Sequence, residues 1–226
     1  SKLQGQNYFV DTAPVLERAL ARNAGLGWIG KNTNLIDKDN GSWFFLAEIF
    51  TDIPLPLDQP ANNHCGTCSA CIDICPTQAI VGPYQLDARK CISYLTIENR
   101  KSIPVEMRKA IGNRIFGCDD CQTICPWNKF AKRVTEKDFL PRSTFMDQPL
   151  EKLFLWSENE WKKNTQETSL QRPGYSGWLR NIAVALGNAE SSEGILSALK
   201  SRVIEKSTMV REHVLWALEQ HKEERN

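Results

Sequence analysis

The sequence lacks a long hydrophobic run, a strong net charge and any cysteine outside one stretch. No apolar run approaches the length of a membrane helix, and no secretory signal is recognisable, so we expect a cytoplasmic protein that contacts no membrane. The 28 basic and 27 acidic residues leave a net charge of +1, and no global field selects a polyanionic partner. The 41% hydrophobic and 24% charged content is typical of a globular protein.

The nonapeptide AGLGWIGKN, residues 24–32, contains the glycine spacing of a dinucleotide loop and most of a phosphate loop. Both motifs must open a helix, because the helix N-terminus holds the phosphate. Here the helical pattern precedes the glycines, over residues 13–23, with Asp11 or Thr12 as its cap. Gly25 is therefore predicted to end that helix in a left-handed conformation, and a nucleotide site is disfavoured. The glycines instead indicate a close approach of the backbone to something.

All eight cysteines lie between residues 65 and 125, in two related motifs. The first four read C-x2-C-x2-C-x3-C-P, and the last three read C-x2-C-x3-C-P with Ile115 where a first cysteine would stand. The first run is typical of double [4Fe–4S] ferredoxins, in which the fourth cysteine ligates the other cluster. The crossed pattern predicts one cluster on Cys65, Cys68, Cys71 and Cys125, and a second on Cys118, Cys121, Cys75 and Cys91, with Cys91 as the spare that completes it.

Disulfides and zinc are the alternatives for these cysteines. Disulfides require an oxidising compartment, which nothing in the sequence indicates. Zinc explains two C-x2-C pairs but neither the third close cysteine nor the repeated C-P ending. We expect each C-P ending, CPTQAI and CPWNKF, to start a short helix.

The remaining chain suggests a multi-domain α+β protein. A strand before Asp11, the helix over 13–23 and one or two core strands in 41–53 suggest part of an α/β domain, followed by a linker over 54–64. After residue 126 the chain is predicted helical, and the segments 179–188 and 210–220 resemble each other at an offset of 31 residues, which suggests HEAT-like repeats. The predicted domains are 1–60 (reductase domain, C-terminal part), 61–130 (double ferredoxin) and 131–226 (helical).

Aromatic and basic residues alternate between residues 156 and 180. This pattern is compatible with RNA contact through stacking and phosphate binding. Core aromatics beneath a solvated charged face explain it better from these residues alone. The aromatic members are Trp156, Trp161, Tyr175 and Trp178, and the basic ones are Lys162, Lys163, Arg172 and Arg180.

In their order, these segments resemble the epoxyqueuosine reductase family. The resemblance rests on VDTAPVLERALARNAGLGWIGKN, the incomplete double ferredoxin, DARKCISYLTIE, GNRIFGCDDCQTICPWN and the helical tail. It implies a cobalamin- and iron–sulfur-dependent oxidoreductase that removes the epoxide oxygen of epoxyqueuosine at the tRNA wobble position. The two clusters would pass electrons from an external donor to cobalamin. Family members carry a preceding part of the reductase domain, so we expect this chain to be an N-terminally truncated fragment, and a monomer.

The resemblance also implies roles for individual residues. It places the glycine loop in the cobalamin-binding domain and makes Asp11 both the acid that protonates the opening oxygen and a cofactor contact. We expect Thr12 to cap the following helix so that Asp11 can face the cobalt. The three histidines, His64, His213 and His221, match no cobalt-ligating motif and are expected to be surface or packing residues. Further expected cobalamin contacts are Ser93, Cys118 and Asp119, and expected tRNA contacts are Arg18, Lys129, Lys162 and Arg172.

Two other functions compete. A reductive dehalogenase-like corrinoid enzyme would share the cofactors but needs no RNA surface, which leaves the helical tail unexplained. A ferredoxin-type electron carrier without chemistry of its own would bind iron and no cobalt, and the α/β portion would have no purpose.

Overall fold

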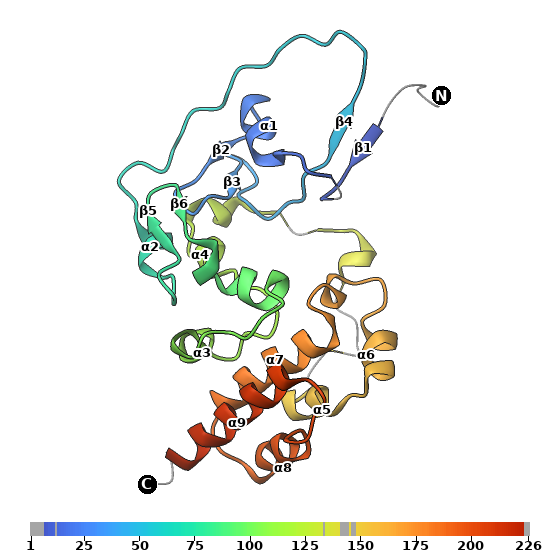
Figure 1. Cartoon of the computed structure of the whole chain (residues 1–226). Helices are drawn as coiled ribbons and strands as arrows, with labels where there is room; N and C mark the ends of the chain where they lie inside the picture. The colour runs from blue at the N-terminus through green and yellow to red at the C-terminus, as the bar shows by residue number, and fades with distance from the viewer. Residues whose placement is uncertain (1–6, 12, 133, 141–144, 146–147, 224–226) are drawn as a thin grey trace. The chain divides into compact units, whose positions relative to one another are not determined.

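The structure, a computed structural model, describes all residues except 1–6, 12, 133, 141–144, 146–147 and 224–226 (Figure 1). The chain divides by its packing into two compact units, and each consists of discontinuous segments. The first unit comprises residues 1–87 and 119–134, and the second comprises 88–118 and 135–226. The two units are defined by contacts within the chain. They do not test the three domains predicted from the sequence, which remain predictions.

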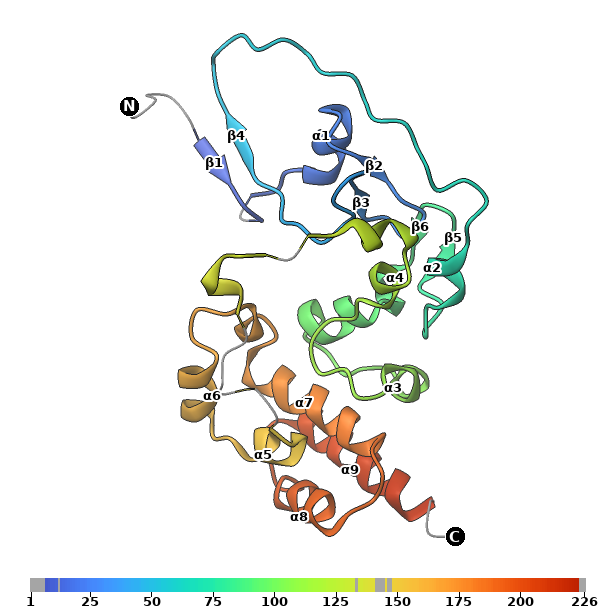
Figure 2. The ribbon, with the colours of Figure 1, turned by 180° about the vertical axis from the view of Figure 1, so that it is seen from behind.

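The first unit contains short elements joined by long loops. Its helices are α1 (Glu17–Asn23), α2 (Ala70–Asp73), α4 (Asp120–Thr123) and a 3-10 helix at Pro126–Phe130. Its strands form three antiparallel pairs, β1 (Asn7–Phe9) with β4 (Glu48–Phe50), β2 (Trp28–Ile29) with β3 (Leu35–Ile36), and β5 (Ile80–Gly82) with β6 (Gln85–Leu86). The predicted linker over 54–64 has no helix or strand and runs as a long open segment in Figure 2.

The glycine loop forms the end of a helix followed by a hairpin. Gly25 has φ +71°, and the N–H groups of Gly25 and Leu26 donate to the carbonyls of Arg22 and Ala21, which is a Schellman ending as predicted. The chain then enters β2, so no helix follows the glycines. A Cβ at Gly27 would lie 2.3 Å from the carbonyl oxygen of Ile36 in β3. The glycines therefore allow the backbone to lie close to another segment of the same chain.

The start of α1 differs from the prediction. The helix begins at Glu17, and its N-cap residue, Leu16, makes no side-chain cap hydrogen bond. Asp11 has φ +53° and lies between β1 and α1, whose N-cap position is taken by Leu16. The predicted cap at Thr12 falls outside the described residues.

The apolar stretch over 41–53 was predicted to form core strands, and this is wrong for most of it. Only β4 forms, and its Ile49 is 69% exposed, while Phe45 outside the strand is 79% exposed. Among the described residues β4 pairs with β1 alone, and that two-stranded ribbon buries neither side chain. The buried apolar residues of this unit lie instead around Trp28, Leu35, Ile36 and Ile80.

The two C-P endings behave differently. CPWNKF forms the 3-10 helix as predicted. CPTQAI does not start a helix, because the chain turns after Cys75 and continues into β5. The helix α2 lies before this ending.

The second unit is helical, as predicted for the chain after residue 126. Its larger helices are α3 (Val105–Ile111), α5 (Leu150–Leu155), α6 (Glu158–Asn164), α7 (Gly174–Gly187), α8 (Glu193–Ser201) and α9 (Thr208–Glu223). A π-helix spans Tyr94–Glu98, and 3-10 turns span Ala88–Lys90, Lys137–Phe139 and Ser169–Gln171. Among the described residues, no helix combines the length and apolar character that a bilayer crossing requires.

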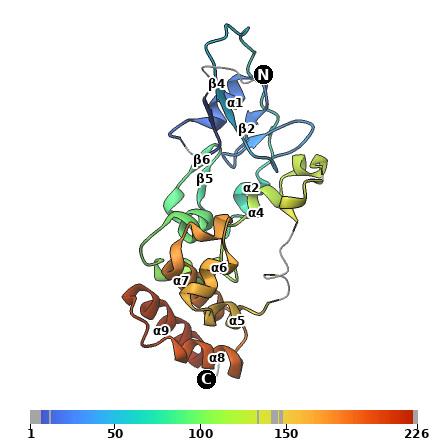
Figure 3. The same cartoon turned by 90° about the vertical axis from the view of Figure 1, so that its right-hand side faces the viewer.

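The helix α7 is the centre of this unit, and every residue from Gly177 to Gly187 is buried. One side packs with α5, α8 and α9 in a core that contains Phe154, Trp178 and Leu199. The other side reaches a second core through Val184, which packs with Ile92 and Ile103. α7 and α9 lie side by side, as Figures 1 and 3 show.

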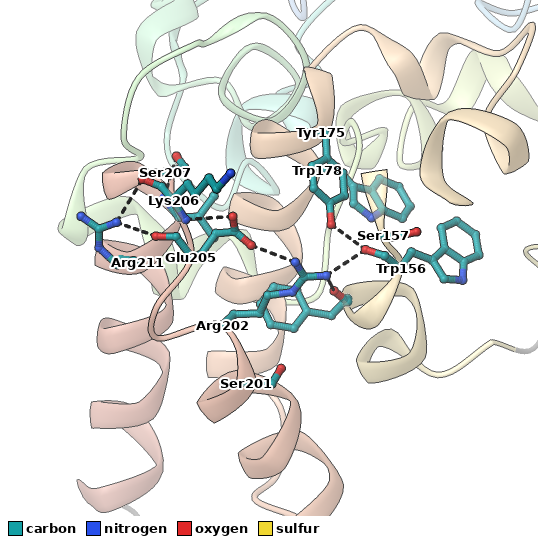
Figure 4. Close-up of polar contacts among 12 residues, drawn as sticks. Trp156, Ser157, Tyr175, Trp178, Ser201, Arg202, Glu205, Lys206, Ser207 and Arg211 are labelled. Carbon is teal, nitrogen blue, oxygen red and sulfur yellow. Dashed lines mark hydrogen bonds and ion pairs between the residues drawn. The ribbon is translucent and has the colours of Figure 1, made fainter. Parts of the chain in front are cut away.

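Polar bonds to backbone carbonyls join the loops of the helical unit (Figure 4). Arg202 after α8 donates to the carbonyl of Trp156 at 2.8 Å and pairs with Glu205. Tyr175 donates to the same carbonyl at 2.6 Å. The α5–α6, α7 and α8–α9 junctions therefore share one network, which explains why Trp156, Tyr175 and Trp178 gather there as packing residues.

Candidate iron–sulfur site

Four of the predicted cluster ligands line one cavity in the first unit. The cavity has a volume of about 100 Å³, and its lining includes Cys65, Cys68, Cys71 and Cys125. Ile36 of β3 and Trp127 also line it. None of the eight cysteines, all of which lie among the described residues, forms a disulfide. The structure thus brings together the set predicted for the first cluster, from segments 54 to 60 residues apart in sequence.

The loop that follows the glycines supports this cavity. Lys31 donates from its Nζ to the carbonyls of Gly66 and Cys68, at 2.7 and 2.8 Å, and so fixes the loop between the first two cysteines. Asn32, almost fully buried, donates to the carbonyl of Cys121 at 3.1 Å. The GKN tripeptide therefore binds the two ferredoxin motifs rather than a nucleotide phosphate.

An aromatic group closes one side of the cavity. The ring of Trp28 makes edge contacts with those of His64 and Trp127, at centroid distances of 4.9 and 5.0 Å. The indole N–H of Trp28 points at the Sγ of Cys65, 3.4 Å away. This is the N–H···S contact that tunes iron–sulfur clusters.

Two of the four thiols of the cavity, Cys71 and Cys125, have raised pKa values. Burial, followed by the nearby Cys125 and Cys65, raises the pKa of Cys71. Burial also raises the pKa of Cys125. Thiolates gathered around one cavity repel one another, and a positively charged iron–sulfur core relieves that repulsion. The donor set therefore fits a [4Fe–4S] cluster.

The two C-x2-C turns have the same backbone. Each carries a four-residue helix, α2 and α4, after an N-cap residue with φ −121° at Ser69 and −113° at Asp119. Each ends on an isoleucine, Ile74 or Ile124, with ψ −16°. The sequence duplication is thus a structural duplication, although the second copy lacks the first cysteine.

The cysteines predicted for the second cluster come from both units. Cys75 and Cys121 lie in the first unit, where the backbone N–H of Ala79 donates to the Cys75 Sγ at 3.2 Å and the Asn34 amide lies 3.9 Å from the Cys121 Sγ. Cys91 and Cys118 lie in the second unit. Neither unit alone holds all four.

The residues predicted to contact cobalamin are divided in the same way. Asp11 and Asp119 are surface residues of the first unit, and partial desolvation of the Asp119 carboxyl, together with the nearby Asp120, raises the pKa of Asp119. Ser93 and Cys118 lie together in the second unit, where the Ser93 hydroxyl accepts a hydrogen bond from the Cys118 N–H at 3.0 Å.

The residues predicted to contact tRNA are all exposed, and the structure gives them local partners. In the first unit, Arg18 donates to the carbonyl of Thr33, and Lys129 stacks on Phe130. In the second unit, Lys162 pairs with Glu158 and Arg172 with Glu98, both at 2.7 Å.

The other members of the aromatic–basic segment are mainly structural. Trp161 and Trp178 are buried, which agrees with the core interpretation. Arg180 is also fully buried, and burial with nearby Arg100 lowers its pKa to about 10. His213 and His221 are buried packing residues and His64 an exposed ring, as expected.

Sequence reasoning missed several residues around the cavity, namely Trp28, Lys31, Asn32 and Asn34. Lys31 and Asn32 stood inside the glycine-rich stretch, so the signal was present, but their partners lie 35 to 89 residues away in sequence. No local pattern specifies such contacts.

The fold and the cavity define the class of an iron–sulfur protein with a duplicated ferredoxin-type motif. Residues 64–128 match the family described as a 4Fe-4S double cluster binding domain. Over nearly its whole length the chain is similar to epoxyqueuosine reductases. It is 63% identical to the one from Xanthomonas campestris and 58% to the one from Pseudomonas aeruginosa, over 96% and 97% of this chain and 61% of each relative.

Solved epoxyqueuosine reductase structures have the same fold. A selenomethionine-labelled one matches 96% of this chain and 57% of its own at 34% identity, with a TM-score of 0.87. One from Bacillus subtilis, described with its catalytic aspartate loop swung out of the active site, matches 97% and 59% at 31% identity, with a TM-score of 0.80. A third, solved with an epoxyqueuosine-modified tRNA-Tyr stem loop, matches 96% and 66% at 29% identity, with a TM-score of 0.76. The chain thus spans about three fifths of the length of these relatives.

Proposed function

We propose that this chain is part of an enzyme that reduces epoxyqueuosine to queuosine in tRNA. The observation that carries the proposal is the cavity formed by Cys65, Cys68, Cys71 and Cys125, in a chain so similar to epoxyqueuosine reductases. The reaction consumes two electrons and two protons, and it converts the epoxide to an alkene and water. Two one-electron carriers supply these electrons naturally.

The chain's own residues would hold the two clusters through their thiolates. Cys65, Cys68, Cys71 and Cys125 would bind the first, and Cys75, Cys91, Cys118 and Cys121 the second. An external donor would reduce them. Bound cobalamin would supply the low-valent metal chemistry that opens the epoxide, with Asp11, Ser93, Cys118 and Asp119 as contacts. The exposed carboxylates of Asp11 and Asp119 fit this role, since they can accept hydrogen bonds from the amide groups at the rim of a corrinoid.

Asp11 would donate the proton to the opening epoxide oxygen. It lies in the turn after β1 with a left-handed backbone, a conformation that aspartate tolerates better than most residues. The Bacillus subtilis relative is described with a catalytic loop, named for an aspartate, swung out of its active site, which supports a loop aspartate here.

The helical residues 131–226 would contribute HEAT-like repeats and tRNA contacts. Arg18 and Lys129 in the first unit, with Lys162 and Arg172 in the second, are the proposed phosphate partners. The relative solved with a tRNA stem loop supports such a surface.

The first test is the metal content of the full-length protein, prepared without air and incubated with cobalamin. We expect about eight irons per chain from two cubane clusters, and one retained cobalt. Iron without cobalt would favour a ferredoxin-type carrier instead. Turnover of epoxyqueuosine tRNA then separates the reductase from a dehalogenase-like corrinoid enzyme.

The second test addresses Asp11. Asp11→Asn, with clusters and cobalamin loaded, is expected to lower kcat by about 10²–10⁴-fold, the usual contribution of a general acid. Asp39→Asn, at an exposed carboxylate in the β3 turn, is the control. Full turnover of Asp11→Asn would exclude the acid role.

A further inference from the structure

The second unit contains a buried hydrogen-bond system around the segment 91–118, whose two ends are Cys91 and Cys118. The proposed function gives these two cysteines to the second cluster but does not say what fixes them relative to each other. Between them lie the π-helix and α3, so 26 residues separate the two thiols in sequence. Some cross-link must hold the ends of this loop together if both thiols are to bind one cluster.

Thr96 links the two ends directly. Its hydroxyl donates to the carbonyl of Ile92, next to Cys91, at 2.7 Å. The same oxygen accepts a hydrogen bond from the N–H of Gly117, next to Cys118, at 2.9 Å. Thr96 is fully buried, so water cannot replace either bond.

Asn181 on α7 repeats the link from the opposite side. Its Nδ2 donates to the carbonyl of Thr96 at 2.7 Å and to that of Ile115 at 2.9 Å. Arg180, its neighbour, donates to the carbonyl of Leu95 at 2.8 Å and so holds the π-helix on α7. Asn181 is 1% exposed, and its amide uses both of its N–H groups in these bonds.

The backbone around the segment is shaped for these contacts. The π-helix widens one turn of the chain after Cys91, closed by a bond from the Asn99 N–H to the Tyr94 carbonyl. Such turns are frequent at functional sites. Gly117 has φ +75°, a left-handed conformation that favours glycine, immediately before Cys118. The apolar core of Ile92, Leu95 and Val184 lies beneath, and Cys118 packs against it.

We infer that Thr96 and Asn181 are positioning residues for Cys91 and Cys118, and that α7 is therefore the scaffold of half of the second cluster site. This inference rests on the proposed function only through the ligand set of the second cluster. It assigns to the helical domain a role in cluster binding, in addition to the partner surface expected of it.

The test compares iron content and cluster spectra in the full-length protein. Thr96→Val keeps the shape but removes the acceptor of the Gly117 N–H. We expect it to lower the iron content about twofold, from about eight to about four per chain, with the spectrum of the first cluster retained. Thr96→Ser keeps the hydroxyl and is expected to restore both clusters.

A matched pair of asparagines on α7 provides the second arm. Asn181→Ala removes the two bonds to the cysteine-bearing turns. Asn188→Ala removes two bonds of the same kind, to the carbonyls of Arg108 and Gly112 at the end of α3, which lie further from Cys91 and Cys118 in sequence. We expect selective loss or a shifted potential of the second cluster in Asn181→Ala and two unchanged clusters in Asn188→Ala. If circular dichroism shows that Thr96→Val does not fold, the comparison of Asn181→Ala with Asn188→Ala tests the positioning role instead.

The outcomes separate the inference from the function on which it rests. Wild-type protein with fewer than two clusters would overturn the ligand set itself. Two clusters in wild type, Thr96→Val and Asn181→Ala, with unchanged potentials, would overturn only the positioning role. Equal losses in Asn181→Ala and Asn188→Ala would also overturn it, since they would indicate a general loss of stability.

Discussion

At the scale of single residues, the hydrogen bond from Trp28 to Cys65 is expected to raise the reduction potential of the first cluster. An N–H donor stabilises the more negative, reduced state of a cluster, so its removal makes the potential more negative. A bond of about 1 kcal/mol corresponds to roughly 40 mV for a one-electron couple. Trp28→Phe is therefore expected to lower the potential by about that amount in a redox titration followed by EPR.

Trp127→Phe is the control for this prediction, because Trp127 packs in the same aromatic group and the substitution leaves the Trp28–Cys65 bond in place. Equal shifts in both variants would show that ring packing, and not the N–H···S bond, sets the potential.

His213 gives the second residue-scale prediction, a dependence of stability on pH. The pKa of His213 is lowered to about 4, chiefly by burial and also by Arg108 and Arg180, while the hydrogen bond to the Met209 carbonyl and the charge of Glu212 oppose the shift. Its Nε2 accepts from the Ile103 N–H at 3.1 Å, so the ring is neutral when folded. The unfolded chain binds the proton with a pKa of about 6.5. The stability from this group is thus present above pH 6.5 and is lost as pH falls toward 4.

The expected loss between pH 7 and pH 5 is about 2 kcal/mol of unfolding free energy. Urea unfolding of the full chain at both pH values measures it, and His213→Gln should remove that part of the difference. An identical pH dependence in the variant would contradict a neutral buried ring.

Predictions for single residues were correct where the role of a residue depends on its near neighbours in the sequence. The cysteine spacing identified the four thiols of the first cavity, and Gly25 was recognised as a left-handed helix ending. It failed for Lys31 and Arg180, whose partners are backbone carbonyls far away in sequence. Arg180 was grouped with exposed basic residues, because sequence alone does not show that a carbonyl-lined site will bury a guanidinium.

At the scale of elements, the crossing of α7 and α9 depends on Gly187. A Cβ there would lie 2.6 Å from Cζ3 of Trp216 and 2.9 Å from Cα of Ala217, so Gly187→Ala must push the helices apart. We expect a loss of about 1–3 kcal/mol, the usual cost of overpacking, in thermal or urea unfolding.

Gly194→Ala in α8 is the matched control. Its Cβ would meet no atom closer than 3.9 Å, so the helix propensity of alanine should make it neutral or stabilising by up to about 1 kcal/mol. A similar loss in both variants would refute a specific close crossing.

Helices were predicted correctly where the apolar pattern repeats over several helical turns, as in the second unit. The strand prediction for 41–53 failed because hydrophobicity indicates burial only when a partner surface exists. Among the described residues β4 pairs with β1 alone, and Ile49 and Phe45 stay exposed. The start of α1 was misplaced because Asp11 and Pro14 resemble a helix start while the backbone turns between them and Glu17.

At the scale of the whole molecule, a net charge of +1 means that the proposed tRNA binding would have to rely on local cations. Binding of an epoxyqueuosine stem loop to the full-length protein should weaken with salt, and each phosphate contact removed should reduce the slope of log K against log salt by about 1. Arg18→Ala and Lys129→Ala are expected to do so. Lys222→Ala, on α9, is the control, and slopes unchanged in all three would exclude these two contacts.

The path of the chain between its two units has a consequence for biosynthesis. The chain leaves the first unit after Asp87 and re-enters it at Asp119, so the ribosome must deliver Cys125 before the first cluster can be inserted. The bonds from Asn181 to the turns beside Cys91 and Cys118 can form only once α7, whose first residue is Gly174, has emerged. A nascent chain would therefore mature its clusters in a fixed order, with the second site waiting for translation of the helical tail.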